Sequence, residues 1–92
     1  MRLKVLALGG DGIGPEVVGA GLKVLECAAK SIDLGLDISE DLLHGAAWER
    51  YNTFIRDETL EKAQASNAVL VGAVGGPKWD NIIRDGGPEE QD

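Results

Sequence analysis

Two short apolar runs, each followed directly by a glycine-rich turn, constrain the fold of this 92-residue chain most strongly. The run 3–8 leads into the first turn, residues 9–16 (GGDGIGPE), and the run 68–71 leads into the second turn, residues 72–80 (GAVGGPKWD). Short, nearly continuous apolar runs are typical of parallel strands that are covered on both faces. Because ligands of open parallel sheets bind at the carboxyl ends of the strands, the two turns can form two sides of one ligand site.

The segment after the first turn predicts an amphipathic helix from about Pro15 to Ser31. Proline suits the first turn of a helix, where its missing N–H costs no hydrogen bond. Cys27 lies near the apolar stripe of this helix, and we expect it to be a small buried side chain rather than a nucleophile. The stripe repeats at intervals of three and four residues and consists of Val18, Leu22, Leu25, Ala29 and Ile32.

The segment Leu36–Leu43 follows a helix-ending glycine and partly alternates between apolar and polar residues. This pattern predicts a weaker, more exposed strand near a sheet edge. Asp37, Glu40 and Asp41 give the segment an acidic face, and their spacing offers no closed metal site.

The remaining elements are short. Gly45–Tyr51 is expected to form a helical turn, and Asp57 is a candidate N-cap for a helix that runs to about Ala65 with Leu60 and Ala63 facing inward. Residues 68–73 form the third predicted strand. The order β-α-β-α-β predicts an α/β fold with parallel strands and right-handed crossovers.

The charge balance narrows the range of partners. The formal net charge is −7, which argues against nucleic acid and anionic membrane because both need a basic surface. No run of 18 apolar residues is present to span a bilayer, and the first residues lead into a strand pattern without a cleavable signal. The single cysteine fits a reducing, cytoplasmic setting.

The first turn is not a dinucleotide fingerprint of the Rossmann type. When G-x-G-x-x-G is started at Gly10 or Gly12, its third glycine position holds Pro15 or Val17. Asp11 would also place a like charge beside a phosphate. We therefore expect this turn to face an uncharged part of a ligand, or to be a structural strand-to-helix connection.

The second turn carries side chains that suit a ligand site. Lys78 can meet an anionic group, and Trp79 can cover an apolar or aromatic part of a ligand or anchor a core. His44, the only histidine, has no sequence partner that would indicate a metal, so we expect a structural or solvent-facing role and no metal site.

The two motifs resemble those of a known family. Residues 10–17 (GDGIGPEV) are similar to the opening motif of the isocitrate and isopropylmalate dehydrogenases, β-decarboxylating oxidoreductases whose fold is distinct from the Rossmann fold. Residues 71–80 (VGAVGGPKWD) resemble the isopropylmalate branch rather than the isocitrate or tartrate members, and residues 45–47 and 57–60 also match. The resemblance covers the whole chain but only the first part of the family's longer chain.

The resemblance implies an NAD site in both turns. Ile13 matches a residue that packs near the adenine, and Glu89 matches one near the nicotinamide ribose and the substrate. Between them, the family's cofactor-contacting stretch corresponds to Gly76, Pro77, Lys78, Trp79 and Asp80.

The implied reaction is NAD-dependent oxidation and decarboxylation of 3-isopropylmalate or a related 2-hydroxy acid, as in leucine biosynthesis, with Mg²⁺ or Mn²⁺ in a homodimer. The family's catalytic residues, substrate arginines and metal ligands fall beyond Asp92. We therefore expect residues 1–92 to be the incomplete N-terminal part of such a domain, inactive alone, marginally stable and prone to self-association. The alternatives are a non-catalytic NAD- or adenosine-binding module and an interaction subunit that pairs with a full-length relative.

Overall fold

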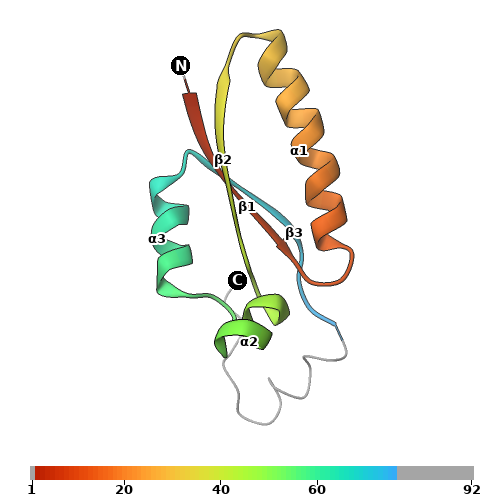
Figure 1. Cartoon of the computed structure of the whole chain (residues 1–92), viewed down its shortest axis with the longest axis vertical. Helices are drawn as coiled ribbons and strands as arrows, with labels where there is room; N and C mark the ends of the chain where they lie inside the picture. Colours follow the sequence, from red (N-terminus) through yellow and green to blue (C-terminus); the bar gives the residue numbers. More distant parts are fainter. Residues whose placement is uncertain (1, 77–92) are drawn as a thin grey trace.

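The computed structural model describes residues 2–76 as a three-stranded parallel sheet with three helices (Figure 1). The strands are in the order β2-β1-β3, so the N-terminal strand is central, and both pairings are parallel. The predicted α/β arrangement with parallel strands is confirmed. The elements in chain order are β1 Arg2–Gly10, α1 Gly14–Ser31, β2 Gly35–Asp41, α2 Gly45–Tyr51, α3 Asp57–Ala65 and β3 Ala68–Ala73.

The central strand β1 is buried on both faces, as its continuous apolar run predicts. Residues 5–8 are all less than about 5% exposed, and successive side chains point to opposite faces of the sheet. On one face, Ala7 packs with Val18 and Leu22 of α1. Leu6 is completely buried on the other face.

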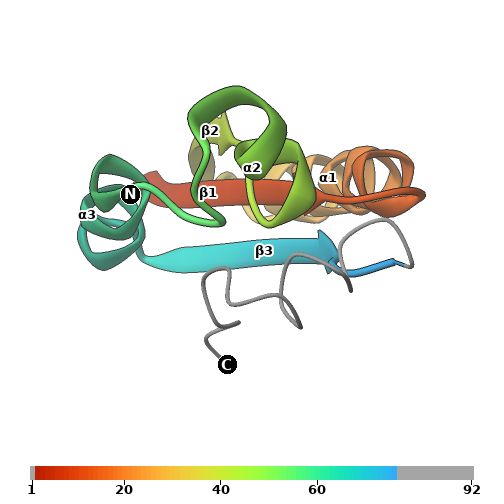
Figure 2. The same ribbon diagram turned by 90° about the horizontal axis from the view of Figure 1, so that it is seen from below.

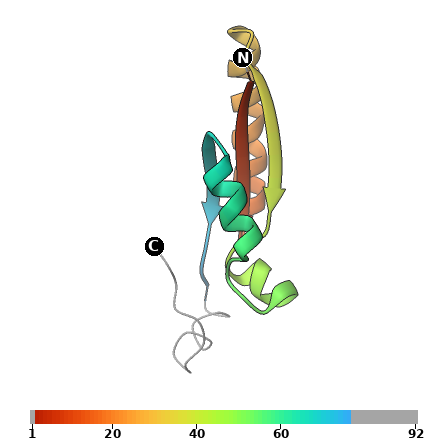
Figure 3. The same cartoon turned by 90° about the vertical axis from the view of Figure 1, so that its left-hand side faces the viewer.

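The helices cover the sheet unevenly. Helices α1 and α3 lie on opposite sides of it, with the strands between them in Figure 1; in Figure 3 the strands lie side by side, with α3 in front of them and α1 behind. Seen from below, β1 lies between β2 and β3, with α2 beside the ends of the strands (Figure 2). The first turn and α2 are thereby brought to the same end of the sheet.

The two outer strands leave apolar surface exposed. Strand β2 is an edge strand of mostly exposed and half-buried residues, as predicted, although it ends at Asp41 rather than Leu43. Strand β3 is the other outer strand of the described sheet, and Val69 and Val71 are 42% and 49% exposed. Among the described residues, apolar side chains of the outer strand β3 are therefore left uncovered.

Two predictions for α1 are wrong. Ile32 is 71% exposed, because the helix ends at Ser31 and Ile32 becomes its C-cap, outside the regular stripe. Cys27 is exposed, because it lies on the helix surface away from the buried positions Val18, Leu22 and Ala29. The stripe itself is otherwise correct, with Leu25 packed against the core.

The prediction for the start and inner face of α3 is also wrong. The N-cap residue is Arg56, and no side chain caps the helix; Asp57 and Glu58 lie in the first turn, where negative charge is favourable. Thr59 is fully buried and Leu60 is 44% exposed. The inner face is rotated because the Thr59 hydroxyl donates a hydrogen bond to the carboxylate of Asp41 at 2.9 Å.

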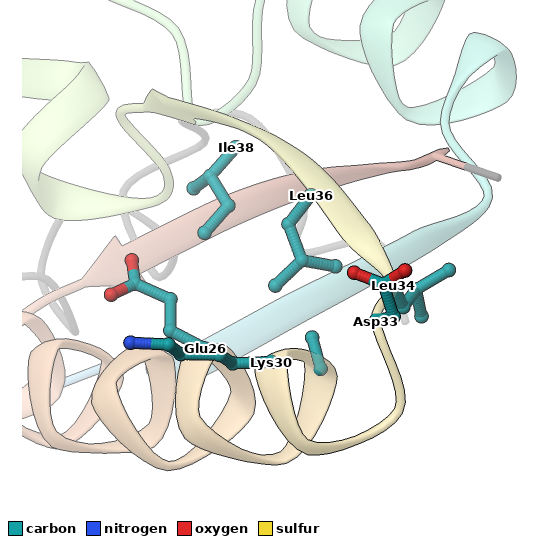
Figure 4. A pocket seen from close by; sticks show the side chains of 7 residues that line it. Glu26, Lys30, Asp33, Leu34, Leu36 and Ile38 are labelled. Carbon is teal, nitrogen blue, oxygen red and sulfur yellow. The ribbon is translucent and has the colours of Figure 1, made fainter.

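Two hollows flank the carboxyl-terminal half of α1. One, of about 360 Å³, lies between α1 and β2, where Leu36 and Ile38 point toward the helix and Glu26 and Lys30 extend from it (Figure 4). The other, of about 510 Å³, opens between α1 and the amino ends of the strands, and only apolar side chains and one glycine line it. Neither is lined by residues of the two turns.

Candidate functional site

The two glycine turns meet at the carboxyl end of the sheet. Because β1 and β3 are parallel neighbours, with Gly10 opposite Ala73, the chain leaves both strands at the same end. The backbone N–H of Asp11 donates to the carbonyl of Ala73 at 2.7 Å, which joins the first turn directly to the second. The predicted juxtaposition of the turns is confirmed as far as residue 76.

Backbone-to-backbone contact explains two of the glycines. A Cβ on Gly14 would lie 1.9 Å from the Gly9 carbonyl oxygen. A Cβ on Gly72 would lie 2.5 Å from the same oxygen and 2.6 Å from the Gly14 carbonyl oxygen. Side-chain atoms do not approach backbone this closely, so these glycines allow the start of α1 to pack against the end of β3.

Other glycines of the turns face open space. A Cβ on Gly12 or on Gly75 would meet no atom of the described structure within 4 Å, and both residues have positive φ angles, +54° and +100°. Ile13, at the N-cap of α1, is 63% exposed beside them. These residues leave room for a ligand to approach the backbone and rest on an apolar side chain.

Asp11 is the polar centre of this end of the molecule. Its carboxylate is only 6% exposed and accepts hydrogen bonds from four donors. Oδ2 accepts from the backbone N–H of Gly75 at 3.0 Å, from Gly45 at 3.2 Å and from the ring Nδ1 of His44 at 2.6 Å. Oδ1 accepts from the N–H of Ala46 at 2.9 Å. We call these five residues the Asp11 cluster.

The cluster supplies α2 with the cap that its own sequence lacks. The N-cap residue of α2, His44, makes no side-chain capping hydrogen bond. The first N–H groups of a helix have no partner within the helix, and a carboxylate near them is stabilised by the helix dipole. Asp11, 34 residues away from Gly45, fills this role across the sheet end.

His44 has an unusual backbone that its contacts hold in place. Its φ and ψ are 58° and −125°, a region that costs a non-glycine residue about 1–3 kcal/mol. The ring stacks on Phe54 with centroids 4.4 Å apart, and the backbone N–H donates to the Phe54 carbonyl at 2.7 Å. Since a carboxylate can only accept, Nδ1 donates to Asp11. The predicted structural role of His44 is confirmed, and the solvent-facing alternative is wrong because the residue is 5% exposed.

The environment of Asp11 favours its charged form. Burial raises the pKa of this carboxyl, but the hydrogen bonds from Gly75, Gly45, His44 and Ala46 outweigh it and leave the pKa below its usual value. The negative charge of Asp11 is therefore compensated by hydrogen-bond donors of the protein. A phosphate near the first turn would not face the uncompensated carboxylate that the sequence alone predicts.

A second buried carboxylate stands at the end of β2. Asp41 accepts from Arg56 at 3.0 and 3.1 Å, from Thr59 at 2.9 Å and from the N–H of Leu42 at 2.8 Å, and Lys62 lies 3.4 Å away. Burial raises its pKa, but these donors outweigh burial and lower it overall. Asp41 thus joins β2 to α3 without contacting either glycine turn.

The structure places only some of the sequence-predicted site residues. Ile13 lies exposed in the first turn, and Gly76 is the last described residue of the second. The others, Pro77, Lys78, Trp79, Asp80 and Glu89, lie outside the described residues. Sequence reasoning missed the pairing of Asp11 with His44, since no local pattern links positions 33 apart.

Residues 2–76 do not offer a metal centre. Within them, no group of three or more His, Cys, Asp or Glu side chains gathers where an ion could be held. The buried carboxylates of Asp11 and Asp41 are already committed to N–H and hydroxyl donors. Within the same residues, no helix is long and apolar enough to cross a membrane.

A parallel α/β sheet with two glycine turns at its carboxyl end defines a ligand-binding α/β unit of the kind found in cofactor-dependent enzymes. A family model described as isocitrate/isopropylmalate dehydrogenase matches residues 4–91. The chain therefore belongs to the isocitrate/isopropylmalate dehydrogenase family, a family of oxidoreductases.

Individual relatives agree with this assignment. The 3-isopropylmalate dehydrogenase of Pseudomonas fluorescens (strain Pf0-1) is 51% identical over 89 residues, which is 97% of this chain and 25% of the relative. That of Xanthomonas oryzae pv. oryzae (strain MAFF 311018) is 49% identical over 82 residues, 89% of this chain and 23% of the relative. The chain thus spans about a quarter of the length of the curated relatives it matches.

Solved structures confirm the fold as a partial dehydrogenase of this family. A β-decarboxylating dehydrogenase from Thermococcus kodakarensis superimposes with a TM-score of 0.68 and 31% identity, over 82% of this chain and 21% of that one. An isocitrate dehydrogenase from Methylococcus capsulatus gives a TM-score of 0.64 and 31% identity, over 80% and 22% of the two chains.

Proposed function

We propose that residues 1–92 form the N-terminal, cofactor-contacting part of an NAD-dependent β-decarboxylating dehydrogenase that acts on 3-isopropylmalate or a related 2-hydroxy acid. The observation that carries the proposal is the meeting of the two turns, with the Asp11 N–H bonded to the Ala73 carbonyl at 2.7 Å and open space over Gly12 and Gly75. The identity to 3-isopropylmalate dehydrogenases supports the choice of substrate.

In this proposal the turns bind and orient NAD. Ile13, 63% exposed, provides an apolar surface for the adenine, and the backbone at Gly75 and Gly76 lets the cofactor approach closely. By the family resemblance, we propose that the cofactor also contacts Pro77, Lys78, Trp79, Asp80 and Glu89, which lie outside the described residues. When bound, NAD would supply the hydride acceptor, and the residues of the two turns would fix its position.

The divalent metal of the family does not fit the described residues. Residues 2–76 bring together no ligand set for it. We therefore assign Mg²⁺ or Mn²⁺ only to a longer enzyme, with ligands from outside residues 2–76, and assign no chemical step to this chain. A homodimer and a cytoplasmic setting belong to the same proposal, and the isolated 92-residue chain is expected to be catalytically inactive.

NAD titration of the chain tests this proposal. Trp48→Phe leaves Trp79 as the only tryptophan, and its fluorescence should change saturably with NAD. Ile13→Ser should weaken binding about tenfold, because an apolar contact worth roughly 1.5 kcal/mol is lost. Ile32→Ser is the matched control, since Ile32 is 71% exposed at the opposite end of α1.

The outcomes separate the proposal from its alternatives. No binding, or equal loss in both isoleucine variants, would contradict the cofactor site. Binding without NAD reduction, assayed with 3-isopropylmalate, malate, tartrate and isocitrate in the presence of Mg²⁺ or Mn²⁺, is expected for the isolated chain. Turnover by a sample that is free of full-length enzyme would contradict its inactivity.

A non-catalytic binding module is the second candidate. Two observations support it: Ile13 is exposed beside the two turns, and residues 2–76 contain no ligand set for a metal. An intact mass from the native source decides between it and a longer enzyme. A mass matching 92 residues, together with saturable NAD binding, favours the module.

A further inference from the structure

We infer that Asp11 is a positioning residue that fixes the second glycine turn against the first and thereby sets the geometry of the cofactor site. The inference deepens the proposed function and rests on it for the identity of the cofactor. It stands on four hydrogen bonds that one buried carboxylate accepts from two segments far from it in the sequence, residues 44–46 and Gly75.

The first part of the argument is the contact with the second turn. The N–H of Gly75 donates to Asp11 Oδ2 at 3.0 Å and makes no other hydrogen bond with residues 2–76. Gly75 has a φ of +100°, and among the described residues no atom would lie within 4 Å of a Cβ at this position. Within residues 2–76, this bond is therefore the contact that holds Gly75.

The second part is that Asp11 is itself fixed. Its backbone N–H is bonded to the Ala73 carbonyl, its carbonyl accepts from the N–H of Gly14, and its side chain is held by His44 and Ala46. A carboxylate held at this many points cannot follow Gly75 if the turn moves. It consequently acts as a rigid reference for the second turn.

The third part is the place of Asp11 relative to the ligand surface. Gly12 and Ile13 follow it directly, and these are the open and exposed residues of the first turn. The side chain of Asp11 is 6% exposed and its oxygens are occupied by four protein donors. We therefore expect Asp11 to connect the two turns from within the protein and not to contact the ligand itself.

The matched control is the other buried carboxylate. Asp41 has a side chain that is 5% exposed, accepts from several donors and stands at the end of a neighbouring strand, but it contacts neither turn. Asp41→Asn should destabilise the protein without releasing Gly75. Asp11→Asn keeps one oxygen acceptor and replaces the other with an NH₂ group that cannot accept.

The experiment measures amide hydrogen exchange at Gly75 and NAD affinity in the 92-residue chain and the two variants. We expect the Gly75 amide to be protected in the wild type and to exchange at least about tenfold faster in Asp11→Asn, since hydrogen bonds to a charged acceptor are among the stronger ones. NAD binding should weaken by about tenfold in Asp11→Asn and stay within twofold in Asp41→Asn.

Several results would overturn the inference. One is a Gly75 amide that exchanges in the wild type as fast as in an unfolded chain. This measurement needs no variant. Another is equal acceleration in both variants, which would show general loosening. If the wild type does not bind NAD at all, the proposed function fails while the exchange data still decide the role of Asp11.

Discussion

The two ends of the parallel sheet are stabilised in opposite ways. At the carboxyl end, buried carboxylates at positions 11 and 41 each collect several hydrogen bonds and join elements that are distant in sequence. At the amino end, the hollow of about 510 Å³ is lined by apolar side chains alone, and the nearby pair of Arg2 and Asp37 is more than half exposed.

The two ends of the sheet differ in how precisely their backbone groups must be positioned. Hydrogen bonds to a carboxylate have directional preferences and fix individual N–H groups, whereas apolar burial is non-directional. The directional contacts are found where the two glycine turns meet. The apolar contacts are found where helix and strands only need to stay together, and they leave Val24 and Val69 exposed.

The largest effect is expected from filling the glycine contact at the carboxyl end. Gly72→Ala places a Cβ within 2.6 Å of two backbone oxygens, so the start of α1 must move away from β3. We expect a loss of about 3 kcal/mol in unfolding free energy, measured by urea denaturation. A change below about 1 kcal/mol would show that the turns are not tightly packed.

Acid should weaken the carboxyl end next. The pKa values of Asp11 and Asp41 are lowered in the folded state, so their stabilisation is complete above the unfolded value of about 3.9 and is lost as the pH falls through the folded values. Stability should decline as the pH drops below about 4. Asp11→Asn should cost about 2 kcal/mol at pH 7 and flatten this decline. An unchanged acid profile in that variant would contradict the role of its charge.

A larger side chain at the amino end of the sheet should not destabilise the protein and should even increase its stability. Gly21 lines the apolar hollow, and its Cβ would meet the Leu70 side chain at 3.7 Å, an ordinary contact. Gly21→Ala should therefore stabilise the chain by about 1 kcal/mol in thermal or urea unfolding. Gly19→Ala, with nothing within 4 Å, measures the helix contribution alone. Destabilisation by Gly21→Ala would remove the contrast between the two ends.

The smallest effect is expected at the surface pair of the amino end. Arg2 donates to Asp37, but the side chains are 62% and 51% exposed. Asp37→Asn should leave the midpoint of urea unfolding nearly unchanged, and any difference from the wild type should shrink in salt. An effect as large as that of Asp11→Asn would show that surface charge, too, determines the fold.

The strands and helices were largely predictable because local patterns define them. The apolar run of β1 and the glycine turn after it predict a strand buried on both faces, and the predicted end of α3 near Ala65 and the predicted strand 68–73 match the structure. Local patterns failed where a residue distant in sequence determines which side chain is buried. Thr59 faces inward and donates a hydrogen bond to Asp41, and Leu60 is left exposed.

The candidate site was predictable only in part. The glycine turns indicate where a ligand can approach, because glycine permits positive φ and close contacts. The sequence did not reveal that Asp11 is buried against His44 and Gly75, since a carboxylate in a polar turn looks solvent-facing until the fold brings donors to it. Ile13 remains a predicted contact, as do the residues beyond Gly76.

The central place of β1 has a consequence for the order in which the chain can fold. Val5 pairs with Ile38 on one side and with Ala68 on the other, so β1 is synthesised before either of its strand partners. Pairings between strands so far apart in the sequence form slowly, because the entropy of loop closure is lost before the contacts that stabilise the pair have formed. The apolar segment Val5–Leu8 therefore stays without its strand partners until β2 and then β3 have been synthesised, and during this period it is open to association with other chains.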